Sequence, residues 1–177
     1  MTAREEYLKK KFMHECFDYQ DGKLIWKERP THHFIDEWRQ KIFNSRQAGC
    51  EAGTVVSGYR MVKFSWGKVG SHRIAFLMHH GFLPAEVDHI NGDPLDNRIE
   101  NLRAATHAEN LRNIKTSTRN TSGQKGVSWH KKSGKWSVGI RLNGRWAHLG
   151  LFASYEDAVS CRKTAEQDIY GGFSNAR

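Results

Sequence analysis

A polar stretch near residue 115 most constrains how this chain can fold. The nine residues from Lys115 to Gly123 include no apolar side chain, so none of them can add to a hydrophobic core. A chain of 177 residues is long enough for one medium domain or for two small ones. The stretch therefore predicts two modules with separate cores, joined by a linker at residues 115–122.

The net charge of +9 is divided unevenly along the chain. Residues 1–55 carry ten Lys or Arg and nine Asp or Glu, residues 56–114 carry seven and six, and residues 115–177 carry eleven and four. From Lys115 to Ala153 there are eight basic residues and no acidic one. This basic C-terminal part of the chain indicates binding to a polyanion, and nucleic acid is the first candidate. The alternative, a cationic surface that only keeps the protein soluble, is disfavoured by so long a run without an acid.

Several classes of protein are disfavoured by composition. No apolar run approaches the length of about 18 residues that a membrane span needs, and the N-terminus lacks the apolar segment of a secretory signal. The three cysteines, Cys16, Cys50 and Cys161, are far apart and form no CxxC pair. They indicate reduced thiols rather than a disulfide framework or a cysteine-based zinc site. We therefore expect a cytoplasmic protein with no membrane contact.

The first module shows alternating strands, turns and helices. The expected elements are a hairpin over residues 17–26, a short helix or loop around 37–43, a strand over 59–64, a turn at Gly67-Lys68, and an apolar helix over 74–78 that stops near Gly81. Residues 1–55 contain no feature that argues for chemistry, and their role is left open.

Residues that carry chemistry concentrate between Val87 and Asn110. A short strand ends in Asp88-His89 and runs into an Asn-Gly-Asp turn. Thr106 and Glu109 have the spacing of a capping box, which predicts a helix with Asn110 in its first turns. Taken one by one, these features are also compatible with an ordinary turn and with asparagines that only cap helices.

This segment resembles the HNH endonuclease family, most closely its phage and intron-associated branch. The pattern DH-x-x-GD…N…NLR…T…N agrees at several spacings over roughly residues 56–114. The resemblance implies that Asp88 and Asn110 bind one divalent cation and that His89 is the general base. It further implies that Asn101 orients the His89 ring. The family permits Asn in place of His at the last metal position, and a phage-encoded chain would act in the host cytoplasm.

Elementary chemistry supports these roles. A histidine can take a proton from water near neutral pH, and one hard cation on oxygen ligands can stabilise the charge of phosphodiester hydrolysis. Mg²⁺ is the expected ion, with Mn²⁺ as the alternative. Among the other histidines, His72 is expected to be structural or at best a DNA contact. Surface positions are predicted for His79, His80 and His107.

The basic tail predicts three strands and a helix. The strands cover Gly126–Lys131, Lys135–Leu142 and Arg145–Phe152, and Asn143-Gly144 is a strong hairpin signal. A helix follows from Ser154, with Ala158, Cys161, Ala165 and Ile169 expected on its buried face. From Gly123 to about Asn175 this pattern resembles the AP2 DNA-binding domain, whose sheet lies in the major groove with the helix behind it.

Alternation along the strands divides the tail's side chains between two faces. The inward set is Val127, Trp129, Trp136, Val138, Ile140, Ala147 and Leu149, and the outward set is Ser128, His130, Lys132, Ser137, Arg141, Trp146 and His148. The predicted DNA contacts are Lys125, Ser128, His130, Lys132, Arg141, Trp146 and His148. Because arginines are few on this face, we expect affinity to rest mainly on phosphates rather than on base readout.

The sequence and its resemblances thus predict an α+β protein with two domains. The first is a ββα-metal HNH nuclease domain, and the second is an AP2-like domain of a three-stranded antiparallel sheet with one helix. The expected boundaries are a lead-in at 1–55, the HNH core at 56–114, a linker at 115–122 and a DNA-binding domain at 123–177. The predicted activity is nicking or cutting of double-stranded DNA, in the manner of a homing endonuclease. One alternative is a non-catalytic DNA-binding regulator. The other is an RNA substrate, which is disfavoured because most aromatic side chains of the predicted sheet alternate toward its buried face. No protein partner is evident, and the sequence decides neither target site nor monomer against dimer.

Overall fold

The computed structural model describes residues 3–113, 119–142 and 144–171, with side chains from Lys9 onward. It divides into two compact units, Met1–His107 and Ala108–Arg177. Each unit combines helices with antiparallel strands, so the predicted α+β class is confirmed. Among the described residues, no helix is long and apolar enough to cross a membrane.

The first unit begins with a helix and a hairpin. Helix α1 (Ala3–Cys16), which the sequence reading missed, leads into strands β1 (Phe17–Gln20) and β2 (Lys23–Trp26). The predicted hairpin is confirmed, because Asp21 and Gly22 take the positive φ values of 45° and 85° that a two-residue turn between antiparallel strands requires.

A three-stranded sheet and a helix follow. The sheet has the order β3 (Thr54–Val56), β4 (Tyr59–Phe64), β5 (Gly67–Gly70), and helix α3 (Ser71–His80) ends at Gly81, whose φ is 82°. The turn between β4 and β5 is at Ser65-Trp66, so the prediction of a turn at Gly67-Lys68 was wrong. Phe64 pairs with Gly67, which draws Gly67 and Lys68 into the strand.

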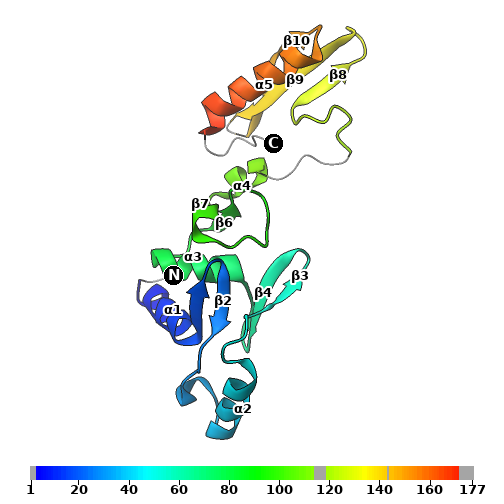
Figure 1. The fold of residues 1–177 in the computed structure, drawn as a ribbon. Coiled ribbons are helices and arrows are strands. Elements are labelled where there is room, and N and C mark those ends of the chain that lie inside the picture. Colours follow the sequence, from blue (N-terminus) through cyan, green and yellow to red (C-terminus); the bar gives the residue numbers. More distant parts are fainter. Residues whose placement is uncertain (1–2, 114–118, 143, 172–177) are drawn as a thin grey trace. The chain divides into compact units, whose positions relative to one another are not determined.

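Helix α1 and the β1–β2 hairpin lie beside α3 and β4 in the first unit (Figure 1), and residues 1–55 share one hydrophobic core with these later elements. Met13, Phe17 and Trp26 pack with Phe64 of β4 and Leu77 of α3. The short helix η1 (Thr31–His33) and helix α2 (Glu37–Gln47), which confirms the helix expected around 37–43, lie between the two sheets in sequence. The part expected to be a lead-in is therefore integral to the first unit.

A second small sheet carries the Asp88-His89 pair. Strands β6 (Glu86–His89) and β7 (Leu102–Ala105) are antiparallel, with Asp88 opposite Arg103, and a loop with the short helix η2 (Ile99–Asn101) joins them. Val87 and Leu102 pack against Ala75 and Phe76 of α3. This packing fixes the end of β6 on the apolar helix.

The second unit matches the predicted order of strands. After helix α4 (His107–Asn113), strands β8 (Val127–His130), β9 (Lys135–Leu142) and β10 (Arg145–Phe152) form a sheet of order β10-β9-β8, with α5 (Tyr155–Tyr170) packed on it. The Ser154 hydroxyl accepts a hydrogen bond from Asp157 N at the start of α5, as a cap does. Of the predicted linker, residues 115–118 lie outside the described residues. The Ser122 hydroxyl donates a hydrogen bond to the Val127 carbonyl oxygen, and the Ser122 carbonyl oxygen accepts one from the Tyr155 hydroxyl. Both bonds hold Ser122 to the second unit.

Two details of this unit differ from the alternation pattern. Trp129 was expected inside but is 49% exposed, and Ile169 of α5 is 38% exposed. The helix instead buries Arg162 and Glu166, which form an ion pair with Nη2 and Oε1 2.8 Å apart. A buried pair is tolerated here because the Arg162 guanidinium also donates to the Gly139 carbonyl oxygen.

Candidate nuclease site

Asp88 and His89 end β6 and are both buried. Successive strand residues point to opposite sides, so the two side chains do not compete for one partner. Arg103, directly opposite on β7, donates from Nε and places Nη2 beside the same carboxylate oxygen, Asp88 Oδ2, each at 2.8 Å. This charged contact fixes the Asp88 carboxylate in a buried position.

The His89 ring is bonded to Asn97. Its Nε2 lies 3.0 Å from Asn97 Oδ1, and Asn97 is itself buried. The Tyr19 hydroxyl donates to the Asn97 carbonyl oxygen at 3.2 Å and accepts from Ile99 N at 2.8 Å. A residue of the first hairpin therefore anchors the loop that orients His89, which gives residues 1–55 a structural role at the site.

The described hydrogen bonds of Asn101 lie within the loop between β6 and β7, and its role in orienting the His89 ring stays a prediction. Its Oδ1 accepts from Asn91 N at 2.9 Å, and its Nδ2 donates to Asn91 Oδ1 at 3.0 Å and to the Asp96 carbonyl oxygen at 2.7 Å. These bonds close the loop between β6 and β7. The described ring contact thus belongs to Asn97, which the sequence analysis did not single out although it lies within the motif.

His72 lies directly beside His89. The two ring centroids are 5.0 Å apart, and the Tyr59 ring is 5.7 Å from His72. Burial, followed by the nearby His89 and Arg73, lowers the pKa of His72 to about 4, so its ring is neutral at neutral pH. His72 Nδ1 is buried and has no hydrogen-bond partner among the residues that the structure describes. A Cβ atom at position 70 would collide with this ring, so a side chain there would force the His72 ring to shift.

The remaining histidines and Asn110 lie elsewhere. His79 and His80 are exposed at the end of α3, and His107 is exposed with Nδ1 2.6 Å from Glu86 Oε1. Their predicted surface positions are confirmed. Asn110 is half-buried on α4 and is assigned to the second unit. Its role as a metal ligand stays a prediction.

The two predicted metal ligands are residue types that bind hard divalent cations. The buried Asp88 carboxylate already holds a cationic group, the Arg103 guanidinium. Asp88 offers carboxylate oxygens and Asn110 offers an amide oxygen. Oxygen is the ligand atom that Mg²⁺ and Mn²⁺ prefer.

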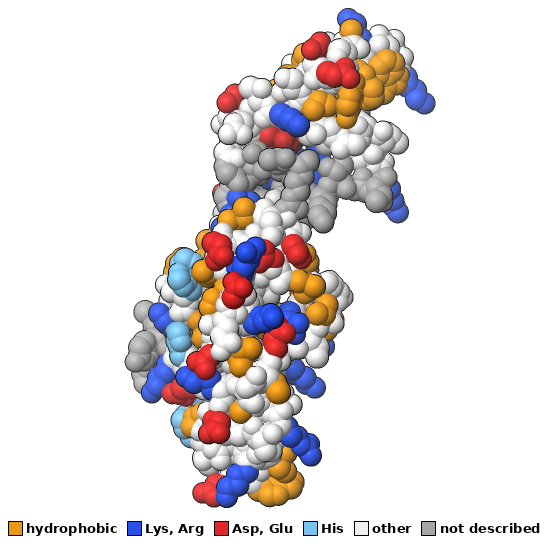
Figure 2. Space-filling model, in the orientation of Figure 1, with side chains coloured by type: hydrophobic (Ala, Val, Ile, Leu, Met, Phe, Trp, Pro, Cys, Tyr) orange, Lys and Arg blue, Asp and Glu red, His pale blue; other side chains and the backbone are white. Residues whose placement is uncertain are grey.

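The outward face of the C-terminal sheet is polar, aromatic and exposed. Acidic and basic side chains are interspersed over the face of the first unit drawn in Figure 2, whereas this sheet face has no acidic residue on its strands. Trp146 is 61% exposed and lies over Gly139, where a side chain would collide with its ring. The exposed members of the predicted DNA-binding set are Ser128, His130, Arg141, Trp146 and His148 on the strands, and Lys132 in the turn between β8 and β9 rather than on the sheet face.

Lys125 differs from the other predicted DNA contacts. Its Nζ donates to the Arg112 carbonyl oxygen at 3.2 Å, and the side chain is half-buried. Burial lowers the pKa of this amine, with nearby Glu166 opposing the change. Lys125 is therefore engaged inside the second unit rather than on the sheet face.

Two viral proteins and one family are similar to parts of this chain. Protein 3.8 of Escherichia phage T7 is 44% identical over 91 residues, which is 51% of this chain and 74% of that protein. The chain belongs to the same family as Protein 3.8. The HNH endonuclease family matches residues 69–112, so the chain carries an HNH endonuclease domain.

A second viral relative extends the comparison. The Uncharacterized HNH endonuclease L560 of Acanthamoeba polyphaga mimivirus is 30% identical over 121 residues, covering 67% of this chain and 62% of that protein. No solved structure matches. These matches support the HNH resemblance of the site but not the AP2 resemblance of the tail, which stays a prediction.

Proposed function

We propose that this HNH protein is a metal-dependent endonuclease that hydrolyses double-stranded DNA, with its C-terminal sheet positioning the substrate. The observation that carries the proposal is the buried Asp88-His89 pair inside the matched segment, with the His89 ring held by Asn97. The tail contributes the acid-free strands and their exposed basic and aromatic side chains, which suit contact with phosphates.

In this mechanism His89 takes the proton from the attacking water. Since Asn97 Oδ1 accepts a hydrogen bond, His89 Nε2 carries a hydrogen and Nδ1 is the nitrogen that can accept the proton. Fixing the ring by one bond to a buried amide sets the direction of Nδ1 before the substrate arrives. His72 and Tyr59 pack beside His89 and restrict the movement of its ring.

Asp88, with Asn110 as the second ligand, would hold the divalent cation. When bound, this cation would stabilise the charge on the phosphate and on the leaving 3′ oxygen. Arg103 keeps the Asp88 carboxylate oriented through Oδ2. Mg²⁺ is the expected ion and Mn²⁺ the alternative.

The test is cleavage of supercoiled plasmid and of the source genome's DNA by the purified protein. We expect conversion to open circles or linear DNA with Mg²⁺, none with EDTA, and a loss of about 100-fold or more in His89→Ala. His107→Ala, which changes an exposed histidine, is the matched control and should cleave normally. Intact DNA on both substrates, together with salt-sensitive gel shifts, would instead favour the non-catalytic DNA-binding protein.

A further inference from the structure

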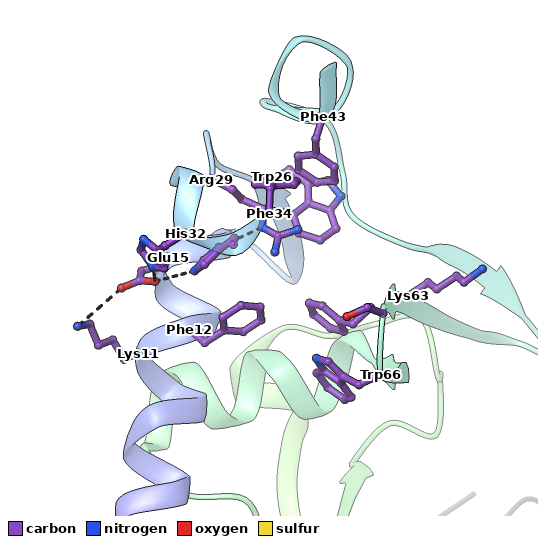
Figure 3. A pocket seen from close by; sticks show the side chains of 13 residues that line it. Lys11, Phe12, Glu15, Trp26, Arg29, His32, Phe34, Phe43, Lys63 and Trp66 are labelled. Atoms are coloured by element: carbon purple, nitrogen blue, oxygen red, sulfur yellow. Dashed lines mark hydrogen bonds and ion pairs between the residues drawn. The ribbon is translucent and has the colours of Figure 1, made fainter. Parts of the chain in front are cut away.

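A cavity of about 640 Å³ in the first unit shares no lining residue with the nuclease site (Figure 3). Most of its lining is aromatic: Phe12, Trp26, Phe34, Phe43, Phe64 and Trp66. In Figure 3, Trp26 and Phe43 lie on one side of the space, and Phe12 and Trp66 lie across from them. Its volume is in the range of sites that bind small molecules or single nucleotides.

Arg29 is held among four of these rings. Its Cζ is 4.8 Å from the ring centroid of Phe34, 5.0 Å from that of Phe43, 5.6 Å from that of Trp26 and 5.7 Å from that of Phe12. Such cation–π contacts hold the guanidinium against apolar surroundings.

The main chain of Arg29 is fixed by α2. Asn44 accepts from Arg29 N at 3.0 Å and donates to its carbonyl oxygen at 3.0 Å, and Gln40 donates to the same oxygen at 3.0 Å. The arginine is therefore a rigid part of the cavity wall.

A relay of hydrogen bonds orients the guanidinium. Arg29 Nε donates to His33 Nδ1 at 3.3 Å, so His33 Nε2 carries the hydrogen that is shared with Glu15 Oε2 at 2.8 Å. Burial lowers the pKa of His33, and the bond to His33 lowers the pKa of Glu15, which keeps a neutral imidazole between the two charged groups.

The terminal NH₂ groups of Arg29 have no oxygen or nitrogen acceptor among the described residues. The nearby Cys16 thiol is a weak acceptor, and burial raises its pKa to about 11, so it carries no charge that would bind the guanidinium. The terminal NH₂ groups thus have only the weak Cys16 sulfur as a partner inside the described wall of the aromatic cavity, which leaves donors available to an external ligand.

We propose that this cavity binds one unstacked guanine nucleotide of the DNA. Guanine is the base that offers two acceptors side by side, O6 and N7, to an arginine fork. Its flat ring suits stacking against exposed aromatic faces such as Trp66, which is 62% exposed and stacked on Phe64 at 4.8 Å. Lys11 and Lys63, both exposed in the lining, suit the phosphates.

Glu15 is the one acidic residue of this lining, and its carboxylate is engaged by neighbouring side chains. Its Oε2 lies 2.8 Å from His33 Nε2 and 3.3 Å from His32 Nε2, and Lys11 Nζ is 3.9 Å from its Oε1. These contacts weaken the electrostatic repulsion between the Glu15 carboxylate and an incoming phosphate.

Glu15, His32 and His33 could also be considered for a metal, because their ligand atoms lie within 4.8 Å of one another. Binding through His33 Nε2 would move the ring hydrogen to Nδ1, where it would face the Nε hydrogen of Arg29. The relay therefore favours a neutral histidine that orients Arg29 over a histidine that binds a metal.

This inference rests on the proposed function only in taking DNA as the source of the nucleotide. The test accordingly uses the full chain with His89→Ala, so that binding is measured apart from cleavage. Fluorescent thymidine octamers would carry one central guanine, 7-deazaguanine or adenine, and binding would be followed by anisotropy without metal. The 7-deaza probe lacks only the N7 acceptor.

We expect the guanine probe to bind about tenfold more tightly than the other two. Arg29→Lys keeps the positive charge but not the two parallel donors, and it should abolish this preference. Trp66→Ala, at an exposed ring, should weaken all three probes. Arg39→Lys, an exposed arginine of α2, is the matched control and should leave the preference intact.

Equal affinity of the three probes for the parent protein would overturn the proposal, as would a guanine preference that survives in correctly folded Arg29→Lys, checked by thermal unfolding. A rise in melting temperature with Zn²⁺ that disappears in His32→Ala would overturn it in favour of a metal site. Failure of plasmid cleavage with a retained guanine preference would reject the nuclease proposal alone.

Discussion

The residues of the nuclease site are buried and held by hydrogen bonds inside the first unit: Asp88 and His89 at the end of β6, and Asn97 and Asn101 in the loop that follows it. The polar side chains on the outer face of the C-terminal sheet instead extend into solvent. The difference reflects what each surface must do. A general base needs a fixed direction, and only buried partners can impose one. Attraction to phosphates needs charge within reach, which mobile exposed side chains provide. Substitutions should therefore have concentrated effects at the first region and distributed effects at the second.

The largest difference is expected between substitutions of Asn97 and of Asn101, which should affect catalysis and stability, respectively. Asn97→Ala removes the acceptor that orients the His89 ring, so we expect the cleavage rate to fall about 10- to 100-fold with little change in DNA affinity. The measurement is single-turnover cleavage together with a gel shift.

Asn101→Ala removes three hydrogen bonds of the loop and should act first on stability, by about 2–3 kcal/mol. Urea unfolding would measure it. If Asn97→Ala proves the more destabilising while Asn101→Ala alone slows the chemistry, the two roles are reversed.

The loop between β6 and β7 should also respond to acid. The Arg98 guanidinium, through its hydrogen bonds to the carboxylate, lowers the pKa of Asp96 from 3.8 to about 2. A carboxyl group with a depressed pKa in the folded state stabilises the protein above its ordinary pKa, and this contribution is lost as the pH falls through 2.

Asp96→Asn should consequently make stability less dependent on pH between about 4 and 2, as followed by urea unfolding at several pH values. Asp18→Asn, at an exposed carboxylate of β1, serves as the control. An unchanged pH profile in Asp96→Asn would show that the ion pair with Arg98 does not support the loop.

The smallest effects are expected at single exposed basic residues of the second unit, such as Lys132 in the turn between β8 and β9. Lys132→Ala should weaken DNA binding severalfold and lower the slope of log affinity against log salt by about one. Lys125→Ala should leave that slope unchanged, because its amine is bonded to the Arg112 carbonyl oxygen. Equal slopes for the two variants would mean that Lys125 contacts DNA after all and that exposure is a poor guide on this unit.

Local signals in the sequence determined most secondary structure. Glycine turns, capping residues and strict alternation predicted the β1–β2 hairpin, the three strands of the tail and the start of α5 at Ser154. These elements are set by contacts within a few residues, which a linear pattern records. The motif around Asp88 and His89 likewise located the HNH site, because strand, loop and partner strand follow one another in the chain.

What only the tertiary structure decided involves residues that are distant in sequence. Spacing could not tell whether Asn97 or Asn101 contacts His89, since the choice depends on how the loop is anchored by Tyr19, some 80 positions earlier. Nor could it show that α1 shares a core with α3, or that Arg29, His33 and Glu15 form a relay at the wall of an aromatic cavity. Burial and hydrogen bonding between distant segments are set by the packing of the whole unit, so they leave no periodic trace in the sequence.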